Sequence, residues 1–212
     1  MKKAISLILL TFLLIFQLPA DDSFTFFGDT LTSVRAKGRE QTVLTGNAGL
    51  VSSTTSIKAD LIEIYGEDNE FAECTGNVEV TDSKKGISLK ASRLFFNRKD
   101  DIIRAEGSAV MEDIKNEVVA KGNFLEYMGE EETCMIQIGV RIFKDDMVCR
   151  SEFAEYSRDT KMLRLSGMPV VYREDDEYRA LRIIIDIDKD EITLEGRVSG
   201  RIFSENGKEE TE

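Results

Sequence analysis

A glycine recurs at intervals of about 30 residues along most of the chain. The intervals are 30, 31, 32, 28 and 29 residues. Self-similarity at a fixed spacing is typical of architectures in which each unit packs against its neighbours. We therefore expect about five copies of one supersecondary unit over residues 42–203. The six glycines are Gly46, Gly76, Gly107, Gly139, Gly167 and Gly196.

A second landmark is a basic residue followed by a small one and usually then a polar one, and its small residue lies 12 to 15 residues after each of the first five glycines. One landmark can arise by chance, but two interleaved landmarks over five periods indicate a repeat. The basic residues are expected either to line one edge of the fold or to pair with carboxylates on adjacent strands. They are Lys58, Lys90, Lys121, Arg150 and Arg179.

Apolar residues occupy every second position around most of these glycines. Leu44, Ala48 and Leu50 flank Gly46 in this way, with polar residues mostly between them. A period of two predicts strands with one buried face. The apolar neighbours of Gly139 have the opposite parity, which predicts a local bulge or register change there.

The apolar phase changes at the second landmark. Ile87, Leu89 and Ala91 share one parity, whereas Leu94 and Phe96 take the other. A repeated phase slip after a small residue predicts a corner, where a strand bends and continues on another sheet. Polar turns follow each corner, and no segment after residue 20 shows a helical stripe. The sequence therefore predicts an all-β fold whose end strands are unpaired.

The two ends of the chain differ from the repeats. Residues 1–20 combine two lysines, an apolar run and a small residue at a plausible cleavage site, as in a cleaved secretory signal. An uncleaved anchor is the alternative, because Leu18 is large for its position. Residues 21–41 form an N-terminal segment with a first strand expected near Ser23–Phe27. Residues 204–212 are acidic and expected to be disordered.

Export from the cytoplasm permits disulfides, and the chain has three cysteines. Cys134 and Cys149 are candidates for a bridge between neighbouring strands. The preferred interpretation is that both, with Cys74, are small buried strand residues.

Composition argues against several functions. The chain has no histidine, so histidine-based acid–base catalysis and Cys/His zinc sites are excluded. A net charge of −12 disfavours non-specific nucleic-acid binding. Two acidic clusters, residues 130–132 and Asp186 to Asp190, are candidates for Ca²⁺ or a catalytic carboxylate pair. We prefer solvated turns, since every repeat has a charged turn there, and predict no enzyme activity, metal or cofactor.

Residues 46–111 resemble the OstA-like, or LptA-like, family. The resemblance rests on Gly76 to Val80, then Lys90-Ala91-Ser92, an aromatic pair at Phe95 and Phe96, and the run Ile103 to Gly107. This family includes the periplasmic component of lipopolysaccharide transport and a domain of its outer-membrane partner. The resemblance implies a twisted β-jellyroll, open along one side, that holds acyl chains and stacks end to end through its edge strands.

The resulting function hypothesis is a periplasmic lipid-binding and transport protein that bridges envelope membranes. Its implied partners are lipopolysaccharide or another envelope lipid, other bridge proteins and further copies of itself. The alternative is a membrane-anchored or structural assembly module of the same fold without lipid cargo. Candidate groove residues, chosen by parity, could equally be ordinary core. They are Leu50, Val78, Val80, Met111, Ile142, Val171, Val198 and Ile202.

Overall fold

The computed structural model describes residues 25–36 and 40–203. The expected signal segment, residues 1–20, and the acidic tail, residues 204–212, lie outside the described residues. Within the described residues, no helix has the length and apolar character needed to cross a bilayer.

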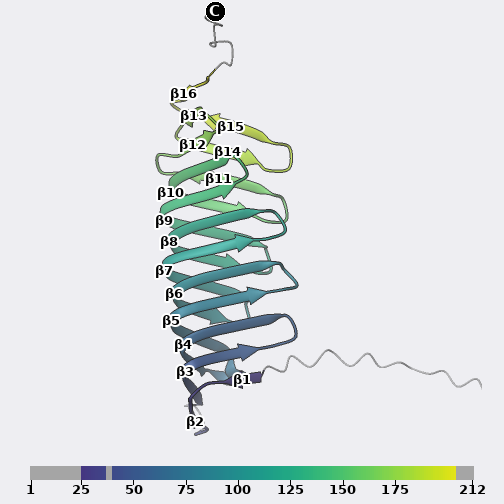
Figure 1. Cartoon of the computed structure of the whole chain (residues 1–212), viewed down its shortest axis with the longest axis vertical. Coiled ribbons are helices and arrows are strands. Elements are labelled where there is room, and N and C mark those ends of the chain that lie inside the picture. Colours follow the sequence, from purple (N-terminus) through teal and green to yellow (C-terminus); the bar gives the residue numbers. More distant parts are fainter. Residues whose placement is uncertain (1–24, 37–39, 204–212) are drawn as a thin grey trace, which may run out of the picture.

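Sixteen strands form a single antiparallel sheet that rises as a column, with consecutive long strands side by side (Figure 1). The prediction of an all-β jellyroll is confirmed, and one short 3-10 turn covers Glu67–Asn69. The first eight strands are β1 (Thr25–Phe27), β2 (Thr30–Val34), β3 (Gln41–Val51), β4 (Thr55–Tyr65), β5 (Phe71–Asp82), β6 (Ile87–Asn97), β7 (Ile102–Asp113) and β8 (Val118–Met128). The others are β9 (Thr133–Lys144), β10 (Met147–Ser157), β11 (Met162–Ser166), β12 (Val170–Arg173), β13 (Asp176–Arg179), β14 (Arg182–Asp186), β15 (Glu191–Glu195) and β16 (Ser199–Arg201).

A corner bends each long strand near its middle, as the sequence predicts. At the corner of β5, Gly76 and Asn77 both have positive φ, at 77° and 46°, and together they oppose the single residue Ser92 of β6. Two residues against one is a β-bulge, which bends the strand. Glycine suits the first place because this backbone conformation is costly for side chains with a Cβ. The glycine and the basic–small landmark therefore meet at one corner.

Gly139 occupies the second position of the positive-φ pair at the corner of β9. There the positive-φ pair is Ile138 and Gly139, at 65° and 69°, so glycine comes second instead of first. Ile136 and Val140 flank the pair and are buried, whereas Ile138 is 58% exposed. The bulge predicted at this repeat is present, but every repeat has one, and the apparent parity change reflects only the position of the glycine.

The corners divide the sheet into two halves that face each other. The A half ends in a row of turns that we call lip A, at residues 52–54, 83–86, 114–117, 145–146 and 174–175. The B half ends in lip B, at residues 66–70, 98–101, 129–132, 158–161 and 187–190. Apolar side chains from both halves form one continuous core between them, and the side with the two lips is the open side of the jellyroll.

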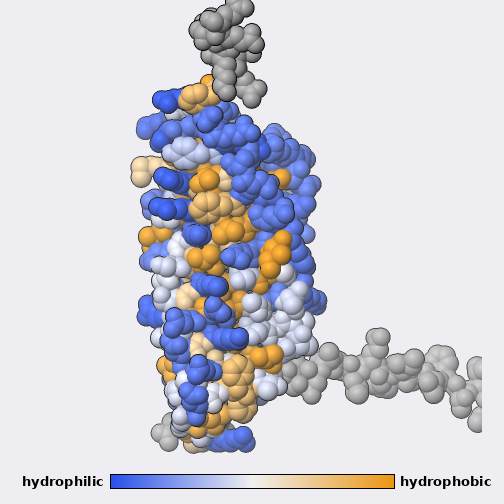
Figure 2. All heavy atoms as spheres, in the orientation of Figure 1, coloured by the Kyte–Doolittle hydropathy of each residue, from blue (hydrophilic) through white to orange (hydrophobic). Residues whose placement is uncertain are grey.

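The outer face is not uniformly polar. Apolar residues are visible along much of the height of one face (Figure 2). On the B half, Phe71 stacks on Phe95 with ring centroids 5.8 Å apart, and Arg104 lies over the Phe95 ring. The outer face of this part of the sheet is therefore partly apolar.

The three cysteines are free and buried, so the preferred interpretation is confirmed and the Cys134–Cys149 bridge is not formed. Cys134 pairs with Tyr156 on the B half, whereas Cys149 pairs with Ile142 on the A half. The corner thus separates two cysteines that lie on adjacent strands.

Candidate functional site

An apolar cleft lies between the two halves near β4 to β7. Its inner part is a cavity of about 70 Å³, and its outer part has a volume of about 370 Å³, within the range typical of ligand pockets. The two parts adjoin, because they share six lining residues. These are Thr55, Ile57, Asp82, Lys85, Phe96 and Asp101.

The structure brings together only some of the residues that parity selects. Leu50 lines the outer part of the cleft, and Val80 and Met111 line the inner cavity. Val78, Ile142 and Val171 are buried in the core but line neither part. Val198 and Ile202 are 57% and 74% exposed beside β16, where no other strand of the described residues covers them.

The alternation of apolar residues around the repeat glycines does not by itself identify most residues of the cleft wall. Residues of the B half supply the side of the cavity facing Val80 and Met111, and their phase follows the corner slip. The change of apolar phase after the corner, which separates Leu94 and Phe96 from Ile87 and Leu89, is the sequence signal that identifies the B-half residues. The additional apolar wall residues of the B half are Leu94, Phe96, Ile103 and Tyr127, and those of the A half are Ile57, Ile87 and Leu89.

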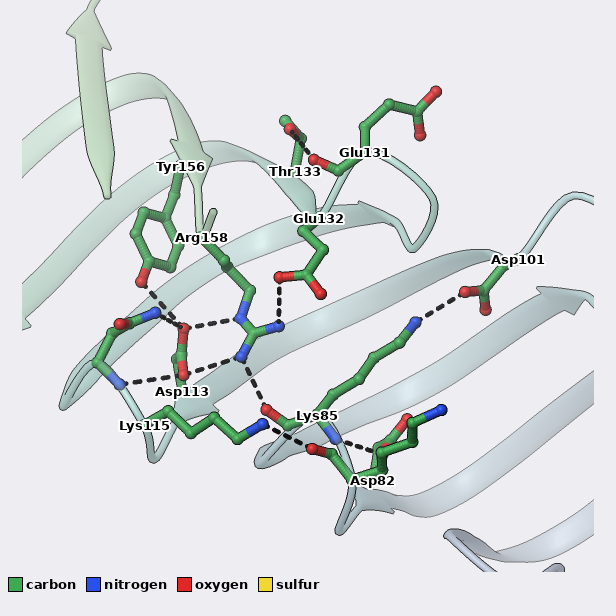
Figure 3. Close-up of polar contacts among 12 residues, drawn as sticks. Asp82, Lys85, Asp101, Asp113, Lys115, Glu131, Glu132, Thr133, Tyr156 and Arg158 are labelled. Atoms are coloured by element: carbon green, nitrogen blue, oxygen red, sulfur yellow. Dashed lines mark hydrogen bonds and ion pairs between the residues drawn. The ribbon is translucent and has the colours of Figure 1, made fainter. Parts of the chain in front are cut away.

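Ion pairs tie lip A, or the strand residue directly before it, to lip B beside and beyond the cleft. Lys85 Nζ lies 2.7 Å from Asp101 Oδ2 at the cleft itself. Farther along, Arg158 Nε donates to Asp113 Oδ2 at 2.7 Å (Figure 3). A third pair joins Arg173 to Asp190 near the C-terminal end. The open side is therefore bridged at three levels by residues distant in sequence.

The Arg158–Asp113 pair is the buried one. Their side chains are 3% and 0% exposed, respectively. Arg158 also donates to the carbonyl of Lys85 at 2.9 Å and to Glu132 at 3.4 Å, so a single guanidinium contacts three hairpin turns (Figure 3). Tyr156 Oη donates to Asp113 at 3.0 Å. We call the group of Asp113, Tyr156 and Arg158 the latch.

The latch fixes the charge of its carboxylate. Burial acts to raise the pKa of Asp113, but hydrogen bonds from Arg158, Asn116 and Tyr156, with the charge of Arg158, outweigh it and hold the pKa below its usual value. Asp113 is therefore ionised at neutral pH and pairs with a permanent cation. The latch closes the open side next to the cleft, which limits the cleft on its C-terminal side.

The five basic landmark residues lie in one row across the outer face of the A half. Backbone pairing places Lys58, Lys90, Lys121, Arg150 and Arg179 at aligned positions on alternate strands. The row lies on a face of the sheet and not at an edge, and pairing with a carboxylate on an adjacent strand is present for Lys90. Lys90 lies 3.2 Å from Glu79 on the adjacent strand, and Arg179 contacts Glu177 of its own strand. Lys121 and Arg150 instead lie over the rings of Phe143 and Tyr172.

Residues of both acidic clusters contact other side chains or backbone groups of the protein. Asp186 accepts hydrogen bonds from Lys189 Nζ and from the backbone of Asp188 and Lys189. Glu132 belongs to the latch region through Arg158. Across residues 25–36 and 40–203, no group of three or more potential metal ligands converges.

The sequence is similar to a known protein family and to several solved structures. The sequence matches the family model of OstA-like proteins over residues 26–173. No curated protein matches the sequence. Sixteen chains among the solved structures match. One is LptH from Pseudomonas aeruginosa, described as the LptA homologous periplasmic component of the conserved lipopolysaccharide transport device.

The match to LptH spans 88% of this chain and 100% of that chain, at 8% sequence identity and a TM-score of 0.28. A superposition this poor carries no argument about the present chain. The family model, in contrast, covers more than half of the sequence and includes nearly all the strands that build the cleft and the latch. The chain belongs to the OstA-like family.

Proposed function

We propose that this protein is a periplasmic lipid-binding protein of the lipopolysaccharide-export type, which holds acyl chains in the cleft between its two half-sheets. The observation that carries the proposal is the cleft itself. It opens between the lips, adjoins the core, and has walls of aliphatic and aromatic side chains from both halves. Membership of the OstA-like family supports the same function.

The physical basis is burial of apolar surface. A hydrocarbon chain that leaves water for such a cleft gains about 25 cal/mol per Å² of buried apolar area. Ile57, Val80 and Phe96 offer that surface without a competing polar group on their own side chains. A cleft of this kind recognises the length and flexibility of a chain more than its chemical identity, and membership of the OstA-like family favours an acylated envelope lipid as the cargo.

The ends of the column support a proposal about assembly. Among the described residues, β1 and β2 cover one side of β3 and leave their own outer backbone edge unpaired. Phe26, Phe27 and Leu31 are exposed at this end, and Val198 and Phe203 are exposed at the other. An unpaired strand edge is a template for pairing with another chain. We propose that copies of this protein, or related bridge proteins, join end to end through these strands.

The location follows from the same proposal. Residues 1–20 direct export, and the remainder acts between the two membranes of a Gram-negative-type envelope. Intact-mass measurement of the purified native protein tests the first step. Loss of residues 1–20 supports a freely moving carrier, whereas retention favours the anchored module.

The direct test of lipid binding uses the purified, delipidated protein. Fluorescence of a neutral apolar dye should rise on binding and fall when labelled lipid A is added as competitor. The test variant is Leu94→Asp, which places a charge in the inner cavity, and its control is Glu155→Asp on the outer face. Leu94→Asp should abolish dye binding if the variant remains folded by circular dichroism, and Glu155→Asp should leave it unchanged. Dye binding no higher than background in wild type contradicts the proposal.

A further inference from the structure

One side chain of the cleft has a polar atom with no partner. Tyr127 lines the inner cavity and is 3% exposed. Its Oη is the sole buried side-chain nitrogen or oxygen within the described residues that makes no hydrogen bond. Leaving a buried hydroxyl unsatisfied is costly, and such a group calls for an explanation.

The charged neighbours of Tyr127 do not supply the missing acceptor. Lys85 Nζ lies 5.2 Å from the centre of the Tyr127 ring, and the guanidinium of Arg158 lies close enough to influence its pKa. Both groups are donors only, so neither can accept the phenolic hydrogen. Glu132 also lies close enough to raise the pKa of Tyr127, but its carboxylate pairs with Arg158 and makes no hydrogen bond with the Tyr127 hydroxyl. Arg158 directs its own hydrogens to Asp113, Glu132 and the carbonyl of Lys85.

The charge around the cleft does not favour an anionic acceptor. Lys85 is already paired with Asp101. The cationic and anionic residues that line the outer part are equal in number, so they offer no net attraction for a carboxylate or phosphate. The cations are Lys84, Lys85 and Arg98, and the anions are Glu70, Asp82 and Asp101.

We propose that Tyr127 Oη is a polar subsite for the neutral carbonyl oxygen of an ester or amide in an acylated ligand. The hydrocarbon chain lies against Ile57, Val80 and Met111, and the carbonyl accepts the phenolic hydrogen at the end of the cavity next to the latch. The subsite distinguishes an acyl group from a plain hydrocarbon, which the apolar walls alone cannot do. This inference rests on the proposed lipid-binding function.

The test compares two fluorescent probes in full-length protein. Diphenylhexatriene has no polar atom, whereas the methyl ester of parinaric acid is a similar polyene with a carbonyl. Tyr127→Phe removes only the hydroxyl, and Tyr65→Phe is the control because its hydroxyl donates to Glu73 on the outer face. Tyr127→Phe should weaken ester binding about fivefold, the size of one neutral hydrogen bond, and leave diphenylhexatriene binding unchanged.

The outcomes separate the two proposals. If wild type binds neither probe, the lipid-binding function itself fails. If wild type binds both and Tyr127→Phe changes neither, or changes both equally, the carbonyl subsite is refuted while lipid binding stands. A similar loss of ester binding in Tyr65→Phe also refutes the subsite.

Discussion

Replacement of Arg158 by methionine should lower the stability of the protein far more than loss of an ordinary ion pair. The substitution preserves an unbranched side chain but removes the guanidinium that joins lip B to Asp113 and to the Lys85 carbonyl. Asp113 is then left as a fully buried carboxylate without its cation. Removing one partner of a buried pair typically costs 3–5 kcal/mol.

The structure places the expected loss toward the lower end of that range. Asp113 keeps hydrogen bonds from Tyr156 at 3.0 Å and from Asn116 at 2.8 Å, which compensate part of the lost contact. We expect a decrease of about 3 kcal/mol in the free energy of unfolding at pH 7, measured by urea denaturation.

The matched control is Arg93→Met, which breaks a pair with Glu106 across adjacent strands. These side chains are 68% and 48% exposed, so solvent screens their interaction. The control should cost less than about 1 kcal/mol. If Arg158→Met lowers the free energy of unfolding no more than Arg93→Met does, the latch does not hold the two lips together, and the claim that it closes the open side next to the cleft is wrong.

Three further predictions follow from the corner, the latch and the cysteines. The pKa of Asp113 is lowered in the folded state, so its contribution to stability is complete above its unfolded pKa of about 3.9 and is lost as the pH falls through its folded-state pKa. Urea unfolding at a series of acid pH values should show this loss of stability in wild type and a much smaller loss in Arg158→Met. Gly76→Ala should destabilise the protein more than Gly139→Ala, because a Cβ at Gly76 would lie 2.3 Å from Asp60 Oδ2, whereas a Cβ at Gly139 meets nothing within 4 Å. Both glycines have positive φ, so thermal unfolding should show a loss of about 1 kcal/mol for Gly139→Ala and a larger loss for Gly76→Ala. Equal losses in the two variants would contradict the packing argument. Burial raises the pKa of all three cysteine thiols, two of them to about 12. A thiol reagent should therefore label them slowly in the native protein and fully in urea, and rapid labelling of the native protein would refute this prediction.

The sequence predicts the local geometry of the repeat well because each requirement acts over a few residues. A positive φ favours glycine at Gly76, and alternation of apolar residues fixes which side of the strand faces the core. The phase slip between Ala91 and Leu94 likewise marks a corner within one strand. What these patterns do not contain is the strand register, which brings the glycine and the basic–small landmark together on adjacent strands.

The cleft and the latch depend on contacts between distant segments. Arg158 and Asp113 are separated by 45 residues, and nothing in the local pattern of either turn shows that they meet across the open side. The unpartnered state of Tyr127 is equally invisible in sequence, because its parity is that of an ordinary core residue. Val198 and Ile202 share the parity of the interior, but parity cannot show that the stack ends there.

The most direct test of the central claim is mass spectrometry of lipids extracted from the protein after purification from its native envelope. The account predicts acylated envelope lipid in roughly stoichiometric amount, and its depletion when Leu94→Asp is purified in the same way as a folded protein. Recovery of no lipid above that found with the folded Leu94→Asp variant would contradict the claim that the cleft carries lipid.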